Sequence, residues 1–434
     1  MSKLEILDWK ATFVDVGSER MHVSIGGGEV KVFMTFTSDL ERLRDWLKSE
    51  GVSSVAMEAT GVYWMPLYAL LEASSIDVRM VDGRQIRRAP GRKSDMQDSQ
   101  WGATLHAHGL LRSGFVPTAD IRRLQDYVRL RCDHITSAGA HVQHMQKAME
   151  RMNIKLHAVI SDLTGVSGLA VVRAILGGER NPESLLRLCH VQIRKNKADL
   201  IRESLRGTWT PEHLFALRQA FESWEHYQRQ IAQCDQEIAK LLPSPDEDDP
   251  GPKRFSSPGR NAPEIDQLRG MMRVMCGHQD LTQLPTFTEY SVLQLIAETG
   301  TDLTRWPTEH HFASWAGLAP GSKQSGKRNG KVKQRRNKVG RLLCVMARSL
   351  ARSKYIALGA YYRRLAARRS KPVAIIAVAR KLATLMWRTM VKGLEYAEQG
   401  IEQYHQKIES QKLKTAQRLA KELGFELHQR PALV

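Results

Sequence analysis

The sequence predicts an α/β domain at the N-terminus, followed by a long and mostly helical remainder. Residues 11–36 alternate apolar and polar side chains, which is typical of β-strands. Residues 38–110 then alternate between amphipathic helical stretches and short apolar strands, and after residue 115 helical periodicity prevails. With 434 residues the chain is also too long for one core, since a domain has on the order of 150 residues.

The predicted N-terminal elements follow one another in a recognisable order. Three strands come first, at residues 11–16, 21–25 and 30–36. Ser38-Asp-Leu-Glu41 matches a capping box, so we expect a helix to begin there and to end at Gly51. The next elements are a strand at 52–57, a helix at 64–73, a strand at 78–81 and a helix from Ser94 to Leu110. This order is the layout of an RNase H-like domain, a mixed sheet with helices on its faces, over residues 1–115.

The remainder of the chain is predicted to be helical around one break. Residues 116–241 are expected to form a helical or coiled-coil connector, because 121–155 and 198–242 are polar, long-periodic and poor in Gly and Pro. The Pro-, Ser- and Asp-rich composition of residues 242–262 predicts a flexible linker. The C-terminal domain, residues 263–400, is expected to be mostly α-helical, with helices near 289–299, 309–317, 339–352 and 374–393. Residues 401–434 read as a charged helical tail.

The net charge of +19 indicates a polyanionic partner. Nucleic acid is favoured over an acidic membrane surface, because the basic residues do not form one amphipathic helix backed by Trp and Leu. No apolar run approaches the ~18 to 20 residues that span a bilayer. The first ten residues also lack an export signal, so we expect a cytoplasmic protein without a membrane partner.

The five cysteines lie singly along the chain, without the spacing of a zinc site or of a disulfide framework: Cys132, Cys189, Cys234, Cys276 and Cys344. They are expected to be small buried apolar residues. Cys132 together with His134, His141 and His144 could form a metal site, because the histidines recur at helical spacing. A polar helix face is the commoner explanation of that pattern.

Four carboxylates from three predicted elements can converge. Asp15 lies within an apolar strand, where a carboxylate is costly unless it is paired or binds a metal. Glu58 ends another apolar strand, and Asp95 and Asp98 share one face at the start of a helix. Phosphodiester cleavage commonly uses two divalent ions held ~3.5 to 4 Å apart, and Mg²⁺ prefers carboxylate oxygens. For Asp95 and Asp98 alone, the helix dipole is a sufficient explanation. The same edge is basic, with Arg84, Arg87, Arg88, Arg92 and Lys93.

A Gly-rich basic segment begins at Gly317 and carries no acidic residue as far as Arg352. Such a segment should contact phosphate. Its serine, Ser325, could attack phosphorus if metals or nearby cations activated it, although serine is also a default turn residue. Residues predicted to bind nucleic acid are Lys93, Lys323, Lys327, Arg328, Lys331, Lys333, Arg335, Arg336 and Lys338.

Two motif sets occur together in this chain. Asp15, Glu58 and Lys93-Ser-Asp95-Met-Gln-Asp98 precede Trp306-Pro-Thr-Glu-His-His-Phe-Ala-Ser-Trp-Ala-Gly-Leu-Ala-Pro320 and then Ser325-Gly-Lys. This combination closely resembles the DEDD insertion-sequence transposases that are guided by a bridge RNA. The resemblance extends from the first strand to about Gly400, and the two independent motif sets lie in the right order.

The resemblance implies a RuvC-like N-terminal domain in which Asp15, Glu58, Asp95 and Asp98 bind Mg²⁺, and a C-terminal transposase domain in which Ser325 is the nucleophile. It implies a recombinase that cuts and rejoins donor and target DNA through a covalent phosphoserine intermediate. An element-encoded bridge RNA would pair with both DNAs. The protein would act in the bacterial cytoplasm, at the nucleoid, as a homotetramer, a dimer of dimers in which the serine of one subunit meets the carboxylates of another.

Two positions depart from the family pattern. Thr286 replaces the glycine expected after Pro285, so a DNA-backbone contact there is in doubt. Ser325 is followed by Gly-Lys rather than Gly-Gly-Lys, and Ser322 is a nearby competitor, although the spacing after Pro320 favours Ser325.

Two other functions fit the same residues. A structure-selective nuclease, similar to a Holliday-junction resolvase, would use the four carboxylates and a metal-activated water without a covalent intermediate. A non-catalytic nucleic-acid-binding protein would use the basic segment alone, but this leaves the placement of Asp15 and Glu58 unexplained. A further basic cluster either binds nucleic acid or forms a solvated helix face: Arg363, Arg364, Arg368, Arg369 and Lys371.

Overall fold

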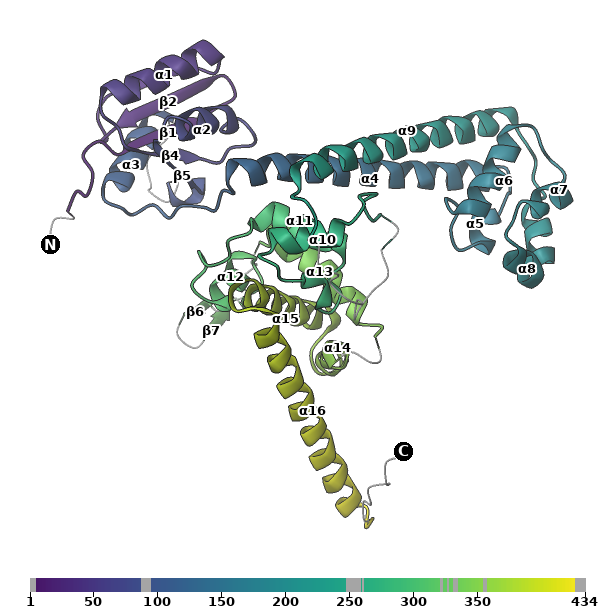
Figure 1. Ribbon diagram of the computed structural model, residues 1–434. Coiled ribbons are helices and arrows are strands. Elements are labelled where there is room, and N and C mark those ends of the chain that lie inside the picture. Colours follow the sequence, from purple (N-terminus) through teal and green to yellow (C-terminus); the bar gives the residue numbers. More distant parts are fainter. Residues whose placement is uncertain are drawn as a thin grey trace. The chain divides into compact units, whose positions relative to one another are not determined.

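The computed structural model describes residues 5–86, 95–246, 259, 261–320, 323–325, 328–330, 335–353 and 357–425. The chain divides into two compact units, Met1–Ala119 and Asp120–Val434. In Figure 1 the first unit is purple to blue and the second runs from blue to yellow. The finer domain boundaries predicted from the sequence, at residues 115, 241, 262 and 400, stay predictions.

The first unit contains a five-stranded mixed sheet with the strand order β3-β2-β1-β4-β5. Its strands are β1 (Thr12–Val16), β2 (Arg20–Ile25), β3 (Val30–Met34), β4 (Ser54–Glu58) and β5 (Asp77–Val81). The first three strands pair antiparallel, whereas β4 lies parallel to both β1 and β5. The predicted RNase H-like order of elements is therefore confirmed.

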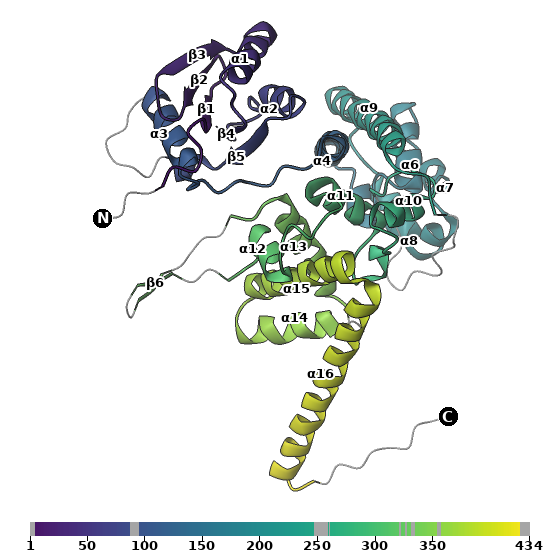
Figure 2. The ribbon, with the colours of Figure 1, turned by 60° about the vertical axis from the view of Figure 1, so that its left-hand side comes forward.

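Helices cover both faces of this sheet, as Figure 2 shows. They are α1 (Thr37–Ser49), α2 (Met65–Glu72) and α3 (Asp95–Ala107), with a short 3₁₀ turn η1 (Gly83–Gln85) after β5. Successive residues of β1 point to opposite faces, because side chains alternate along a strand. Val14 packs with Leu43 of α1 and Leu67 of α2, whereas Phe13 packs with Ala103 of α3. The face that carries Phe13 is therefore the face that α3 covers.

The predicted capping box is wrong. Helix α1 begins at Thr37, its N-cap is Phe36, and no side chain caps it, so Ser38 lies inside the helix. The backbone carbonyl of Phe36 accepts hydrogen bonds from Asp39 and Leu40. Since the N-cap residue Phe36 is exposed, water can satisfy the first amide groups of the helix without a side-chain cap. The other predicted cap, Ser94, lies outside the described residues.

The second unit begins with two long helices, α4 (Ala119–Arg151) and α9 (Pro211–Leu241). They run antiparallel, because Arg131 pairs with Asp235 while the later His141 stacks on the earlier Tyr227. Four short helices join them at the far end of the pair: α5 (Leu156–Val159), α6 (Val166–Leu176), α7 (Pro182–Arg187) and α8 (Val191–Ser204). Figure 1 shows this connection in teal.

The helical segment expected at residues 198–242 forms two helices in the structure. Helix α8 ends at Ser204 and α9 begins at Pro211, with Trp209 in a left-handed conformation between them (φ 52°). Proline is favoured in the first turn of a helix, where its missing amide hydrogen is not needed. Pro211 therefore starts a new helix here.

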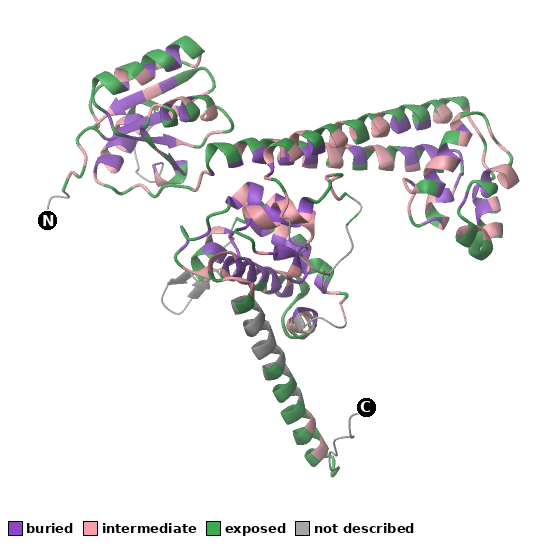
Figure 3. Ribbon diagram, in the orientation of Figure 1, coloured by how far each residue is buried: buried purple, intermediate pink, exposed green. Residues whose placement is uncertain are grey.

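The rest of the second unit is a bundle of helices. They are α10 (Leu268–Met275), α11 (Glu289–Thr299), α12 (Glu309–Trp315), α13 (Lys338–Leu350), α14 (Ala357–Arg368), α15 (Lys371–Lys392) and α16 (Leu394–Glu422), with a 3₁₀ turn η2 (Leu281–Gln283). Helix α15 contacts α12, α13, α14 and α16, and Figure 3 shows buried positions along its length. The predicted helices of this region are confirmed, but α14 was not predicted and the tail helix begins earlier than expected.

Three further predictions from the sequence concern the linker, the cysteines and the possibility of membrane-spanning helices. Most of the predicted linker, residues 247–258 and 260, lies outside the described residues. The cysteines are free thiols, four of them buried, and Cys132 contacts the Tyr290 hydroxyl and the Gln294 amide, each at 3.2 Å. Within the residues described, none of the helices combines the length and the apolar character needed to cross a membrane.

Candidate active site

Asp15 and Glu58 lie side by side at the carboxyl ends of two parallel strands. The register of β1 and β4 places Val14 opposite Met57, so the next residue of each strand is the carboxylate. Adjacent strands are about 4.8 Å apart. Alternation puts Asp15 on the same face as Phe13, which is the face that α3 covers, and both carboxylates are half-buried.

The direction of α3 is fixed by contacts at its C-terminal end and in its middle. His106 is hydrogen-bonded through Nε2 to Ser54 Oγ (2.8 Å), at the start of β4. Burial, together with the charge of Arg79, holds the pKa of His106 below its ordinary value, which favours a neutral ring. Gly102 packs against the Phe13 ring so closely that a Cβ atom there would lie 2.6 Å from Phe13 Cδ1.

The first turn of α3 lies at the carboxylate end of the sheet. Ser99 is buried, and its hydroxyl donates to the carbonyl of His22 (3.0 Å) and to the carbonyl of Asp95 (2.8 Å). His22 is the register partner of Asp15 on β2. Helix α3 therefore runs antiparallel to β1 and brings Asp95 and Asp98 to the edge where Asp15 lies.

Gly83 provides room for the carboxylate of Glu58. A Cβ atom at Gly83 would overlap that carboxylate, so only glycine fits beside it without displacing it. Neither Gly83 nor Ser99 was predicted from the sequence. A signal for Gly83 was present, since it stands directly after the apolar end of β5 in Val81-Asp-Gly83.

The four carboxylates share one edge of the sheet, but in the structure they do not form a metal-binding group. Among the described residues, no three His, Cys, Asp or Glu side chains form a group that could hold a metal. This also applies to the alternative at Cys132 and the α4 histidines. The donor set nevertheless fits a hard divalent cation, since Asp15, Glu58, Asp95 and Asp98 supply only carboxylate oxygens.

The basic residues expected at this edge are mostly outside the described residues: Arg87, Arg88, Arg92 and Lys93. Arg84 is described, and its guanidinium Nε donates to both oxygens of Asp82 at 3.0 Å. The Asp82 carboxylate raises the pKa of Arg84 and offsets its charge locally. Arg84 is therefore already ion-paired.

Ser325 lies on a β-hairpin rather than in the predicted loop. Strand β6 (Lys323–Ser325) pairs antiparallel with β7 (Arg328–Gly330), and Ser325 is opposite Arg328. The residues of β6 and β7 are polar or glycine. They therefore lack the alternation of apolar and polar side chains from which strands are predicted. The side chains of these strands are not described, and Ser322, Lys327, Lys331 and Lys333 lie outside the described residues.

The segment that carries Ser325 connects α12 to α13, and the residues at its two ends are packed together. Asn337 caps α13 by accepting from the Gly340 amide (2.9 Å), and its side-chain amide donates to the Trp315 carbonyl at the end of α12 (3.1 Å). Gly340 lies against the Ala316 carbonyl, where a Cβ atom would overlap the oxygen. The two ends of the Ser325 segment are thereby held together.

The basic residues that follow the hairpin have different surroundings. Arg335 and Arg336 are exposed. Lys338 Nζ lies 3.8 Å from the Glu298 carboxylate, which also accepts two hydrogen bonds from Arg129 of α4, at 2.9 and 2.8 Å. Arg335 and Arg336 are thus accessible to a polyanion, whereas the nearby Glu298 carboxylate partly offsets the charge of Lys338.

Comparisons with known proteins match both candidate parts of the chain. Residues 14–154 match the DEDD domain family of IS110 elements, described as a transposase. Residues 278–363 match the transposase IS116/IS110/IS902 family. The first match includes the four carboxylates, and the second includes Thr286 and Ser325. No curated protein matches the chain.

Proposed function

Because the chain belongs to the IS110 family of transposases, which catalyse DNA strand transfer, we propose that it moves an insertion sequence with the four carboxylates and Ser325 as its catalytic groups. The family's DEDD domain implies a divalent metal. Our proposal is more specific: the metal is Mg²⁺, the intermediate is a phosphoserine, and the choice of DNA sequence lies in an RNA. The protein would do this in the bacterial cytoplasm, where its DNA lies.

The observation that carries the proposal is the placement of the carboxylates. Asp15 and Glu58 end adjacent parallel strands on the face covered by α3, whose first turn holds Asp95 and Asp98. Like charges that lie near one another repel, and a cation bound between them would offset that repulsion. A cation-binding role would explain why four carboxylates gather at this edge of the sheet.

Each carboxylate would have a distinct part in holding the metal. Asp15 and Glu58 would be fixed ligands because they project from the sheet, and Gly83 and Ser99 would keep their surroundings in place. Asp95 and Asp98 would complete the set from α3. Bound there, Mg²⁺ would offset negative charge on the attacking and leaving oxygens of the phosphodiester.

Ser325 would attack a phosphorus atom of the DNA backbone. The Ser325 hydroxyl gives up its proton as the Oγ–P bond forms, one P–O bond to the sugar breaks, and the sugar oxygen takes up a proton and leaves as a hydroxyl, so that no net proton is gained or lost. Attack by the hydroxyl of another strand then reverses these bonds and releases the serine. Exposed cations of the same segment, such as Arg335 and Arg336, would hold the phosphate.

The partners in this proposal are donor DNA, target DNA, an element-encoded bridge RNA and further copies of this chain. The RNA would pair with both DNAs, while protein groups contact backbone and shape. The active site would be composite, with Ser325 of one subunit acting beside the carboxylates of another in a homotetramer, a dimer of dimers.

A denaturing gel tests the chemistry. Purified protein is incubated with Mg²⁺, the RNA encoded beside its gene and labelled cognate DNA. We expect a protein–DNA band that is lost in Ser325→Ala and retained in Ser322→Ala. Asp15→Asn should lose all processing, whereas Asp77→Asn, at an exposed position of the same sheet, should retain it.

The gel also separates the main alternative. Cleavage of equal extent in wild type and Ser325→Ala, without a protein–DNA band, would mean a metal-dependent nuclease that uses water as the nucleophile. Loss of the covalent band in Ser322→Ala alone would move the nucleophile to Ser322. Processing that survives Asp15→Asn would remove the carboxylates from the mechanism.

A further inference from the structure

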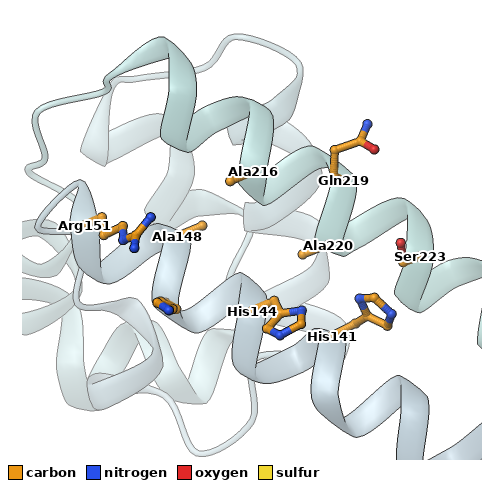
Figure 4. Close-up of a pocket in the computed structure, with 9 residues that line it drawn as sticks. His141, His144, Ala148, Arg151, Ala216, Gln219, Ala220 and Ser223 are labelled. Atoms are coloured by element: carbon orange, nitrogen blue, oxygen red, sulfur yellow. The ribbon is translucent and has the colours of Figure 1, made fainter.

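A groove of about 330 Å³ runs between α4 and α9, far along the chain from both catalytic candidates. We call it the α4–α9 groove. Its α4 side is lined by His141, His144, Lys147, Ala148 and Arg151, and its α9 side by Ala216, Gln219, Ala220 and Ser223. These spacings of three and four residues place each set on one helix face. Figure 4 shows the labelled α4 residues facing the α9 residues across the groove.

The lining of the groove is basic and contains no acidic residue. Lys147 and Arg151 are exposed, and within the described chain neither forms an ion pair or a hydrogen bond with another side chain. Glu150 of the same helix is instead paired with Lys155. The positive charge of the groove is therefore not offset by the protein itself, which favours an anionic ligand.

The imidazole of His141 is held in a fixed orientation in this groove. Its ring stacks on Tyr227 with ring centroids 5.5 Å apart, and it meets the ring of His144 edge-on at 5.4 Å. The His141 Nδ1 atom is enclosed and has no hydrogen-bond partner in the described part of the chain, so Nε2 is the atom left to meet a ligand. Burial, and then His144, lower the pKa of His141, which favours a neutral ring that offers a hydrogen bond rather than a charge.

We propose that the α4–α9 groove binds the sugar–phosphate backbone of a nucleic acid strand. Lys147, Arg151 and the histidine nitrogens suit phosphate oxygens. The exposed methyl group of Ala216, beside the buried Ala148 and Ala220, provides an apolar contact for a sugar ring, and Gln219 and Ser223 add neutral hydrogen-bond donors. A free phosphate ion would leave this apolar contact unused, whereas a backbone uses both.

The inference takes only the class of partner, a nucleic acid, from the proposed function, and its test does not depend on strand transfer. Binding is measured in EDTA with the Asp15→Ala protein, so that no DNA is processed. The probes are a fluorescein-labelled RNA hairpin and a DNA duplex of the same stem length. The binding measurement is therefore valid even if the proposed catalysis is wrong. Conversely, the covalent protein–DNA band can still be tested if the groove does not bind nucleic acid.

The first variant removes the two cations of the groove, as Lys147→Gln with Arg151→Gln. We expect weaker binding and a slope of log affinity against log salt that is shallower by about 2, since each lost phosphate contact reduces it by about 1. The matched control removes one exposed lysine and one exposed arginine that do not line the groove, as Lys195→Gln with Arg229→Gln. Its affinity should exceed that of the groove variant.

The second variant adds a negative charge without a change of size. Gln219→Glu places a carboxylate in the groove, and we expect it to weaken binding on the order of tenfold by repelling phosphate. The control is Gln228→Glu, nine residues further along α9 and exposed. At ~100° per residue this position faces the opposite side of the helix. Both substitutions preserve shape, so the comparison survives even if the double variant folds poorly.

The two probes assign the source of the backbone. If the groove variants lose affinity for the RNA hairpin alone, the groove binds RNA, and if they lose affinity for the DNA duplex alone, it binds DNA. Lower affinity for both probes supports a backbone site without preference between RNA and DNA. Unchanged affinity and salt slope for both probes would overturn the proposal, as would equal losses in the control variants. The groove would then be left to a different anionic partner, such as an acidic peptide.

Discussion

At the scale of single residues, Thr286 has a backbone conformation that its side chain disfavours. Its φ of 72° lies in the left-handed region, which β-branched residues rarely adopt. The Phe287 amide donates to the Leu284 carbonyl (3.2 Å), so Pro285 and Thr286 are the central residues of a turn. Proline followed by a residue with positive φ is the signature of a type II turn, whose third position favours glycine. The turn is thus retained although glycine is absent.

Replacing Thr286 by glycine should stabilise the protein. The substitution relieves left-handed strain of about 1–3 kcal/mol and costs ~0.5–1 kcal/mol in the chain entropy of glycine. It also removes a hydroxyl oxygen that is buried and has no partner among the described residues. We expect a gain of about 1 kcal/mol in the free energy of unfolding, measured by urea denaturation.

The control for this prediction is Thr286→Ala, which removes the hydroxyl but keeps the Cβ atom. It should fall between wild type and Thr286→Gly. If Thr286→Gly were less stable than wild type, strain at this turn would not limit stability, and the side chain would have a contact that outweighs it.

At the scale of elements, the position of α3 depends on a close contact with β1. A Cβ atom at Gly102 would lie 2.6 and 2.7 Å from two atoms of the Phe13 ring, closer than packed carbons approach. Gly102→Ala should therefore push α3 away from the sheet and cost about 1–3 kcal/mol. Because the first turn of α3 carries Asp95 and Asp98, strand transfer should fall more than the loss of folded protein explains.

A matched glycine shows what the same substitution does without a steric conflict. Gly139 lies within α4, and a Cβ atom there would have nothing within 4 Å. Gly139→Ala should stabilise that helix by ~0.5–1 kcal/mol. In the Gly102→Ala background, Phe13→Leu should restore part of the stability and of the activity. A Gly102→Ala protein with normal stability and activity would show that α3 tolerates the displacement.

The elements differ in how far the sequence predicts them. Strands β1 to β5 and their helices were predicted within a few residues, because the alternation of apolar side chains is a local property. The break between α8 and α9 has a local signal in Pro211, and tertiary packing also contributes to it: Gly207 lies against the Met152 carbonyl and the Ile154 side chain, just after the end of α4. Short polar strands such as β6 and β7 have no apolar period from which they could be predicted.

The candidate site was also predictable only in part. Asp15 and Glu58 were identifiable because each is a carboxylate in an apolar strand, and the parallel register then explains why they are neighbours. Ser99 was not, since its role appears only when α3 lies against the sheet, whereas Gly83 had a signal in its position two residues after the apolar end of β5. The functions of Asp15, Glu58, Asp95, Asp98 and Ser325 stay proposals, which the gel experiment tests.

At the scale of the whole molecule, one buried ion pair joins the long helices to the C-terminal bundle. Arg131 of α4 and Asp235 of α9 have side chains only 1% and 3% exposed, and two hydrogen bonds of 2.5 and 3.2 Å connect them. Arg131 also donates to the Asn261 carbonyl (3.0 Å) and stacks on the Tyr290 ring of α11 (4.6 Å). The Asp235 carboxylate accepts from the Glu264 amide (3.1 Å). The pair therefore connects α4, α9 and the start of the bundle.

Removing one charge of this pair should be far more damaging than removing both. Asp235→Asn leaves the Arg131 guanidinium buried without its counter-charge, which costs about 3–5 kcal/mol, whereas well-packed apolar pairs often replace buried ion pairs at little cost. We therefore expect Arg131→Met with Asp235→Leu to regain more than half of the stability lost in Asp235→Asn. The recovery stays incomplete because the Asn261 carbonyl and the Glu264 amide lose their partners. Urea denaturation of wild type, Arg131→Met, Asp235→Leu and the double variant gives the coupling energy. If the double variant were no more stable than Asp235→Asn, the hydrogen bonds to Asn261 and Glu264, and not the ion pair, would be what holds the bundle to the long helices.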